Sequence, residues 1–220
     1  MNIIRLTLLT DDLEATKAFY QGVTGLTLSR SEEGELCFQA GHTELIFRQS
    51  EDIRPVYHFA FTIPANKLEE AMAQLRSKTQ LLSLPDGETV ADFANWNAKA
   101  FYFYDNNGNI LEYIARYDLQ NASDQPFSGR HICCISEVGL VTEHVSDLAT
   151  QIHEAYSTPF FPKQPRSDFF TVLGDDNGLF IIVIKERHWY PTAIAAEAFP
   201  TIITFRDDLQ QEQELSFGFV

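Results

Sequence analysis

NIIRLTLLTDDLEATKAFYQGVTGLTL, residues 2–28, joins a strand pattern to a helix pattern. Residues 2–10 are rich in strand-forming residues and contain neither Gly nor Pro, and Ile4, Leu6 and Leu8 form one wholly apolar strand face. Two aspartates then offer N-cap oxygens, and apolar side chains recur at helical spacing up to a pair of glycines. The segment therefore predicts a strand that packs on the helix following it.

This order of patterns recurs along the chain. Three further strand candidates complete a first β-α-β-β-β unit. A second unit extends from residues 57–63 (YHFAFTI) to residues 109–116 (NILEYIAR). A third begins at residues 135–142 (ISEVGLVT), which resemble residues 3–10 (IIRLTLLT). The tail supplies two more strand candidates, so a fourth unit is partial at most.

Pairing of these units predicts the fold class and the domains. A single unit leaves one face of its sheet uncovered, whereas two units side by side form a curved mixed sheet with helices outside and a cup inside. We expect an α+β fold with a paired βαβββ domain at residues 1–117 and an exposed linker at 118–130. Residues 131–220 would hold the third module and the partial fourth. An unpaired third module would leave a free strand edge, which favours a homodimer.

Composition excludes several classes of partner. The chain has 220 residues and a formal net charge of −15, so it repels nucleic acid and anionic membranes. The three cysteines, Cys37, Cys133 and Cys134, lack the spacing of a disulfide framework or a zinc knuckle. Neither an apolar run of membrane-spanning length nor a signal-peptide pattern is visible, so we expect a cytoplasmic protein without a membrane partner.

Two motifs resemble the vicinal-oxygen-chelate superfamily of glyoxalases, bleomycin resistance proteins and extradiol dioxygenases. LTDDLEATKAFYQGVTGLTL (residues 9–28) is similar to the family's opening strand and helix. FYFYDNNGNILEYI (residues 101–114) is similar to its closing hairpin. The resemblance implies paired βαβββ modules around a cup that holds a small molecule and, in many members, a divalent metal. It covers residues 1–117 well and residues 131–190 weakly.

The resemblance also implies positions for metal ligands. Metal-dependent members carry a His on the first strand of each module and a Glu on the last strand. His58 and Glu112 fit these positions in the second module, and Glu44 fits the last-strand position of the first module. Taken alone, a His on an apolar strand is more often a core residue than a ligand. In the third module Glu137 stands at the His position and Ile181 at the acid position.

Arg5 departs from this pattern, because it stands where the family places the His of the first module. A guanidinium has no lone pair for a metal, and it would instead form ion pairs with Glu44 or Glu112 in a shared cup. We therefore favour a cup that binds a small organic molecule without a complete metal site or a cofactor, with Arg5, His58 and Glu112 as its reactive groups.

Two alternatives remain open. One is a lyase, isomerase or extradiol dioxygenase that uses a divalent Zn, Fe, Ni or Mn ion on His58, Glu112 and possibly Glu44. The other is a structural module whose cup has lost its function. Polar and aromatic residues expected to contact a small-molecule ligand in the cup are Thr7, Trp96, Asn97, Phe101 and Phe103.

Overall fold

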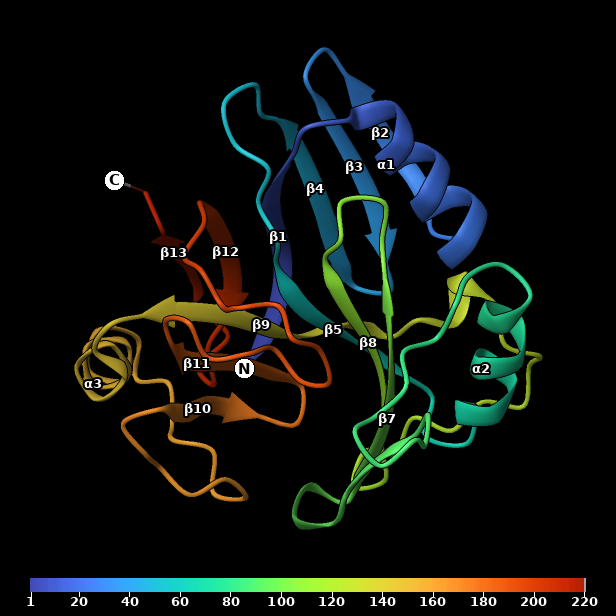
Figure 1. Cartoon of the computed structure of the whole chain (residues 1–220). Coiled ribbons are helices and arrows are strands. Elements are labelled where there is room, and N and C mark those ends of the chain that lie inside the picture. Colours follow the sequence, from blue (N-terminus) through green and yellow to red (C-terminus); the bar gives the residue numbers. More distant parts are fainter. Residues whose placement is uncertain (220) are drawn as a thin grey trace.

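The computed structural model describes residues 1–219 as an α+β fold with two mixed sheets, which confirms the predicted class (Figure 1). The first unit contains β1 (Asn2–Thr10), α1 (Leu13–Phe19), the π-helical turn η1 (Tyr20–Thr24), β2 (Thr27–Glu32), β3 (Glu35–Ala40) and β4 (Thr43–Gln49). The second contains β5 (His58–Ile63), α2 (Leu68–Arg76), β6 (Ala91–Phe93), η2 (Ala94–Trp96), β7 (Ala98–Tyr104) and β8 (Ile110–Arg116).

The remainder of the chain forms a third unit and a hairpin. Its elements are η3 (Gly129–His131), β9 (Cys134–Thr142), α3 (Val145–Tyr156), β10 (Phe170–Asp175), β11 (Gly178–Ile184), β12 (Thr201–Arg206) and β13 (Glu212–Phe217). Because β13 runs antiparallel to β12, these two strands form a hairpin without the helix and parallel strand of a full unit. None of the helices in residues 1–219 has both the length and the apolar character needed to cross a bilayer.

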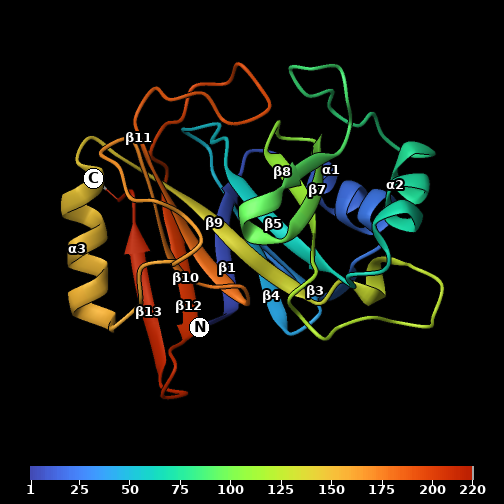
Figure 2. The same ribbon diagram turned by 90° about the horizontal axis from the view of Figure 1, so that it is seen from below.

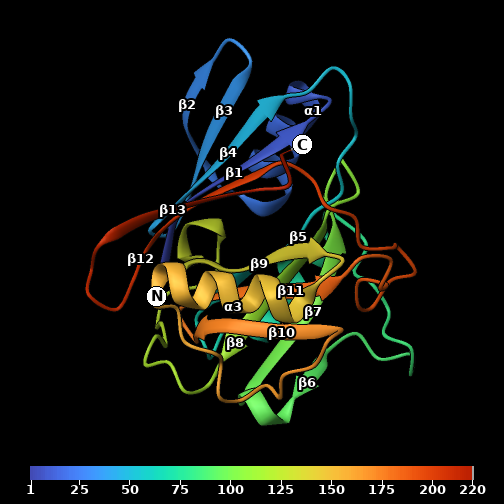
Figure 3. The same cartoon turned by 90° about the vertical axis from the view of Figure 1, so that its left-hand side faces the viewer.

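The units pair differently from the arrangement expected for residues 1–117. Within residues 1–219, one sheet has the order β13-β12-β1-β4-β3-β2 and the other has the order β10-β11-β9-β5-β8-β7-β6. The first unit therefore pairs with the C-terminal hairpin, and the second unit pairs with the third. Figure 3 shows the two sheets one above the other. The open strand edges explain this pairing. Within its own unit β1 is paired on one edge only, by β4, and β12 covers the other edge. In the same way β8 pairs with one edge of β5, and β9 covers the other.

This pairing removes the exposed edge on which the expectation of a dimer depended. The third unit uses β9 to join β5, so its first strand is already covered within the described residues. Dimerisation therefore stays a prediction without that support. Residues 118–130, expected to be a linker, connect β8 to β9 and contain the start of the short turn η3.

The main core lies between the sheets and the helices. Alternation along β1 directs Leu6 and Leu8 into this core, and β5 contributes Phe59 and Phe61 to the same cluster. The helices cover the outer surfaces: α1 contacts β3 and β4, α2 contacts β7 and β8, and α3 contacts β9, β10 and β11. Figure 2 shows α3 and α2 at opposite ends of the molecule. The opposite face of the second sheet is free to line a cup.

Gly41, in the β3–β4 turn, lies against the chain segment that leads into β9. The backbone N–H of His42 donates to the carbonyl of Cys133 over 3.1 Å, and a Cβ at Gly41 would overlap that carbonyl. Gly41 also has a φ of +59°, which favours glycine. This contact holds the first sheet against the entry to β9.

We expect Gly41→Ala to destabilise the protein more than Gly34→Ala. Gly34 also has positive φ, at +76°, but a Cβ there meets open space. The backbone penalty shared by both variants is about 1–2 kcal/mol, and overlap at Gly41 adds about 1–3 kcal/mol. Urea unfolding measures both losses. Equal losses would contradict the close approach to Cys133.

Candidate functional site

Three buried side chains from neighbouring strands of the second sheet converge on one point. They are His58 on β5, Glu112 on β8 and Glu137 on β9, and their candidate ligand atoms lie within 4.8 Å of one another. Strand register explains the convergence, because Ala60 pairs with Glu112 on one side and with Glu137 on the other. Two carboxylates therefore flank one small side chain, and His58 lies two residues earlier on the same face of β5.

The His58 imidazole is oriented by the backbone of the neighbouring strand. Its Nδ1 lies 3.0 Å from the carbonyl oxygen of Ile110, which can only accept, so Nδ1 carries the proton. Nε2 is left with a lone pair and lies 3.7 Å from Oε2 of Glu112. Burial lowers the pKa of His58 to about 4. The ring is therefore neutral and directs the lone pair of Nε2 toward the carboxylates, which is the form of histidine that binds a metal ion.

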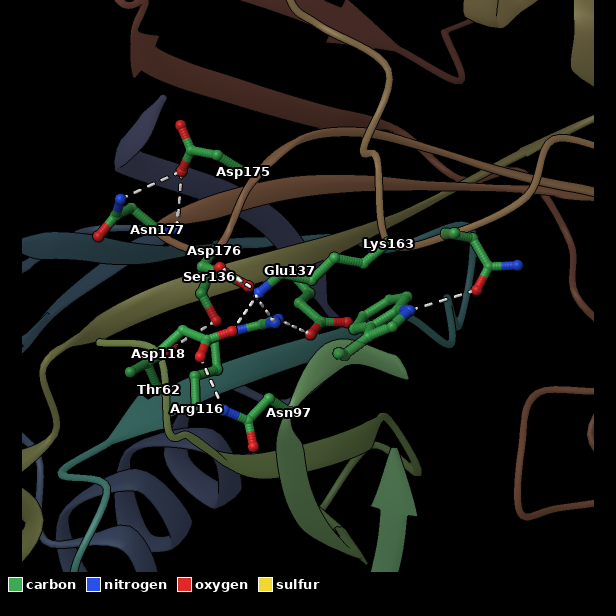
Figure 4. Close-up of polar contacts among 12 residues, drawn as sticks. Thr62, Asn97, Arg116, Asp118, Ser136, Glu137, Lys163, Asp175, Asp176 and Asn177 are labelled. Carbon is green, nitrogen blue, oxygen red and sulfur yellow. Dashed lines mark hydrogen bonds and ion pairs between the residues drawn. The ribbon is translucent and has the colours of Figure 1, made fainter. Parts of the chain in front are cut away.

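Glu137 is held by a fully buried arginine at the end of β8. Arg116 donates from Nη2 to Oε1 of Glu137, and its Nη1 lies 3.4 Å from Oδ1 of Asp176 (Figure 4). The guanidinium also lies over the Trp96 ring at 5.6 Å. This contact uses Oε1 of Glu137, so Oε2 remains available to a second partner.

A chain of ion pairs links this buried pair to the surface. Lys163 lies 2.6 Å from Asp176 and 2.8 Å from Asp118, and Asp118 accepts a hydrogen bond from the side chain of Asn97 (Figure 4). These contacts tie together the end of β8, the β10–β11 turn and the loop before β10. The loop that carries Lys163 is thereby fixed beside the site.

Glu137 is paired with the guanidinium of Arg116, whereas Glu112 has only the His58 ring within ion-pair distance among residues 1–219. Burial raises the pKa of Glu112, and the neighbouring Glu137 charge raises it further. Burial also raises the pKa of Glu137, although Arg116 opposes this shift. Arg116 forms ion pairs with Glu137 and Asp176 and none with Glu112. Glu112 must therefore take up a proton or meet a further cation.

A cavity of about 480 Å³ opens beside the three side chains. His58, Glu112, Glu137 and Ile181 line it together with Gln164 and Arg187, and its aromatic walls are Phe93, Trp96, Tyr102, Phe170, Trp189 and Tyr190. Trp189 lies over β9 because Gly139 carries no side chain: a Cβ there would overlap the indole ring. The indole packs on His58 with ring centroids 5.0 Å apart. The second sheet therefore forms a largely aromatic cup with a polar base.

Arg5 and Glu44 do not reach this cup, which corrects the expectation that they converge with His58 and Glu112. Both lie on the first sheet, where β1 and β4 pair Arg5 directly with Glu44. Nε of Arg5 donates to Oε2 of Glu44 over 3.0 Å, and the two side chains are 43% and 33% exposed. The β4 residue at the position equivalent to Glu112 is instead the apolar Ile46, which pairs with Thr7 as Glu112 pairs with Ala60.

The predicted ligand-contact residues divide between the two faces of the sheets. Trp96 lines the cavity, whereas Asn97 is exposed and supports Asp118. Phe101 and Phe103 belong to the main core on the opposite face of β7. Alternation along β7 places Tyr102 in the cavity instead, beside its strand partner Glu112.

Thr7 lies outside the cavity lining, on the first sheet. It pairs with Ile46 of β4 and Ile202 of β12. Glu137 was recognisable in the sequence from its place at the His position of the third module. Its contribution to this site depends on β9 pairing with β5, and neither strand's own pattern specifies that partner. Arg116 carries no motif signal of its own.

Removing Arg116 should destabilise the protein strongly, because it leaves Glu137 as an unpaired buried charge. We expect Arg116→Met to lose about 3–5 kcal/mol of unfolding free energy. The double variant Arg116→Met/Glu137→Leu should recover much of that loss. Arg5→Met is the matched control and should cost no more than about 1 kcal/mol, because its pair is exposed. Chemical denaturation of all three measures this, and equal losses for Arg116→Met and Arg5→Met would contradict the buried pair.

The low pKa of His58 has a consequence for stability in acid. Between pH 6.5 and about 4 the unfolded chain binds a proton that native His58 does not, so unfolding becomes easier as the pH falls. From pH 7 to pH 5 this residue alone should remove about 2 kcal/mol. Denaturation of chelator-treated protein at both pH values should show that part of the decline missing in His58→Gln. An unchanged decline would show that His58 titrates normally.

Comparison with known proteins agrees with this architecture. The model of the Glyoxalase/Bleomycin resistance protein/Dioxygenase superfamily matches residues 2–113. A solved structure from Bacillus subtilis with a provisional dioxygenase assignment is 14% identical, with a TM-score of 0.65 and coverage of 98% of this chain and 84% of that one. A variant of glyoxalase I from Zea mays is also 14% identical, with a TM-score of 0.58 and coverage of 98% and 92%.

The two solved structures establish likeness of fold across nearly the whole chain. A search of curated proteins finds no significant match. The family match covers more than half of the 220 residues and rests on the units that carry His58 and Glu112. The chain therefore belongs to the glyoxalase/bleomycin resistance protein/dioxygenase superfamily.

Proposed function

We propose that this protein binds a divalent metal ion through His58, Glu112 and Glu137, and a small organic substrate in the adjoining aromatic cavity. The observation that carries the proposal is the convergence of three buried donor groups within 4.8 Å of one another. Glu137, from the third module, takes the place that the metal-dependent alternative gave to Glu44 of the first module. The proposal therefore follows the metal-dependent alternative with a different third ligand.

The chemistry of the donor set fits such an ion. His58 offers a neutral Nε2 whose orientation is fixed by the Ile110 carbonyl, an arrangement typical of metal-ligating histidines. The two carboxylates supply hard oxygen donors and negative charge. One nitrogen and two oxygens suit Mn²⁺ or Fe²⁺ better than a soft, thiolate-seeking ion. A bound cation would also relieve the unbalanced charge of Glu112.

The residues around the cavity would position the metal ligands and the substrate. Trp189 covers His58 and limits its contact with water, and the other aromatic side chains provide an apolar surface for the body of a substrate. Arg116 holds Glu137 in place by binding one of its oxygens. A bound divalent ion would polarise substrate oxygens, which is the chemistry shared by the lyase, isomerase and dioxygenase reactions considered for this family.

A metal-free binding cup is the second candidate, and two observations favour it. Arg116 already provides Glu137 with a cation, and Ile181 offers no donor at the last-strand position of the third module. In such a cup a protonated Glu112 would act as a hydrogen-bond donor to the bound molecule. Metal binding separates the two candidates.

We expect chelator-treated protein to take up close to one equivalent of Mn²⁺ or Fe²⁺. His58→Ala and Glu112→Gln should each weaken uptake by at least about tenfold, because each removes one of three ligands. Glu44→Gln, on the other sheet, is the matched control and should bind normally. Elemental analysis after gel filtration measures uptake, and circular dichroism confirms that each variant is folded. Absence of uptake of Mn²⁺, Fe²⁺, Zn²⁺ and Ni²⁺ by the native protein would favour the metal-free cup.

A further inference from the structure

Arg187 brings a guanidinium to the cavity that Glu112 and Glu137 also line, but it forms an ion pair with neither of them. It follows β11, lines the cavity and is half-buried. Within residues 1–219, no side-chain carboxylate lies within ion-pair distance of its guanidinium, although the chain has 31 acidic residues. The described partner of the guanidinium is the Phe170 ring, 5.0 Å away.

This situation distinguishes Arg187 from the other arginines. Arg5, Arg30, Arg48, Arg54 and Arg116 all have carboxylate partners. The remaining arginines without a carboxylate partner in residues 1–219 are exposed, and water solvates their charges; they are Arg76, Arg130, Arg166 and Arg206. Arg187 alone of the unpaired arginines in the described chain is withdrawn from water. Burial also lowers its pKa, which is consistent with incomplete solvation.

The backbone holds Arg187 at the cavity. Its N–H donates to the carbonyl of Ile184 over 3.2 Å, and its carbonyl accepts from Ala196 over 2.8 Å. Trp189, two residues later, packs on His58. The same loop therefore carries both the Arg187 guanidinium and the indole that covers the His58 ring.

We propose that Arg187 recognises the negatively charged group of the substrate, and that the substrate is a small organic oxyanion with an apolar or aromatic body. A guanidinium offers paired N–H donors that match a carboxylate or a phosphonate. The body of the molecule would lie against Trp96, Tyr102 and Trp189. This inference rests on the proposed function for the identity of the cavity as the substrate site, and it does not require the metal.

Fluorescence provides a direct test, because the chain has two tryptophans and both line the cavity. The probes are phenylacetate, phenylphosphonate and phenylacetamide, the last being a neutral match for phenylacetate in shape. The variants are Arg187→Gln and Arg187→Lys, with Arg76→Gln as a control that removes an exposed, unpaired arginine from α2. Each titration is run on chelator-treated protein and on protein supplied with Mn²⁺.

The native protein and Arg76→Gln should bind at least one of the two anions better than phenylacetamide. Arg187→Gln should weaken anion binding by about tenfold or more and leave the amide unchanged, because a charge-assisted hydrogen bond is lost. Arg187→Lys should retain part of the preference. Which anion binds tighter distinguishes a carboxylate-bearing from a phosphonate-bearing substrate.

Three results would overturn the inference. They are no response to either anion at millimolar concentration, anion binding no better than amide binding, and equal anion affinity in the native protein and Arg187→Gln. Failure of the metal proposal has a different signature: Mn²⁺ is not taken up, yet the anion preference still depends on Arg187. Mn²⁺ uptake with an anion preference independent of Arg187 would reject the inference alone.

Discussion

The pairing of β5 with β9 is the constraint on which the site depends. It places Glu137 opposite Ala60, while the parallel pairing of β5 with β8 places Glu112 on the other side of the same residue. A shift of one residue in either register would turn one carboxylate to the opposite face of the sheet. The same pairing brings Arg116 to Glu137, and thereby balances part of the buried charge that the register creates.

The two sheets use equivalent positions for different purposes. In the second sheet, the positions around Ala60 hold one imidazole and two carboxylates beside an aromatic cup. In the first sheet, the corresponding strands offer Arg5 and Ile46, and Arg5 satisfies its charge with Glu44 in a partly exposed pair. A cation and an aliphatic side chain cannot form a metal site. The three-residue donor cluster of the described residues therefore lies in the second sheet.

Repetition of units, the fold class and two of the three donors could be predicted from the sequence. Periodicity and turn residues specify a βαβββ unit locally, and the resemblance to the family identified His58 and Glu112 by their places on the first and last strands. The partner of each unit could not be predicted, because β1 and β5 are both apolar strands. Their own units pair only one edge of each, and the other edge could accept a strand from any other unit. For that reason Arg5 was expected in the cup, whereas Glu137 is the residue found there. Phe101 and Phe103 were assigned to the wrong face of β7, since the AFYFY pattern is aromatic on both faces and only the register identifies Tyr102 as the residue in the cup.

The claim that a metal centre forms between the second and third units can be tested most directly by locating the ion. Crystals grown with Mn²⁺ and measured at the manganese absorption edge should give one strong anomalous peak. We expect this peak to lie within bonding distance of Nε2 of His58 and of carboxylate oxygens from Glu112 and Glu137. A peak elsewhere in the molecule, or well-ordered side chains at this point with no peak, would contradict it.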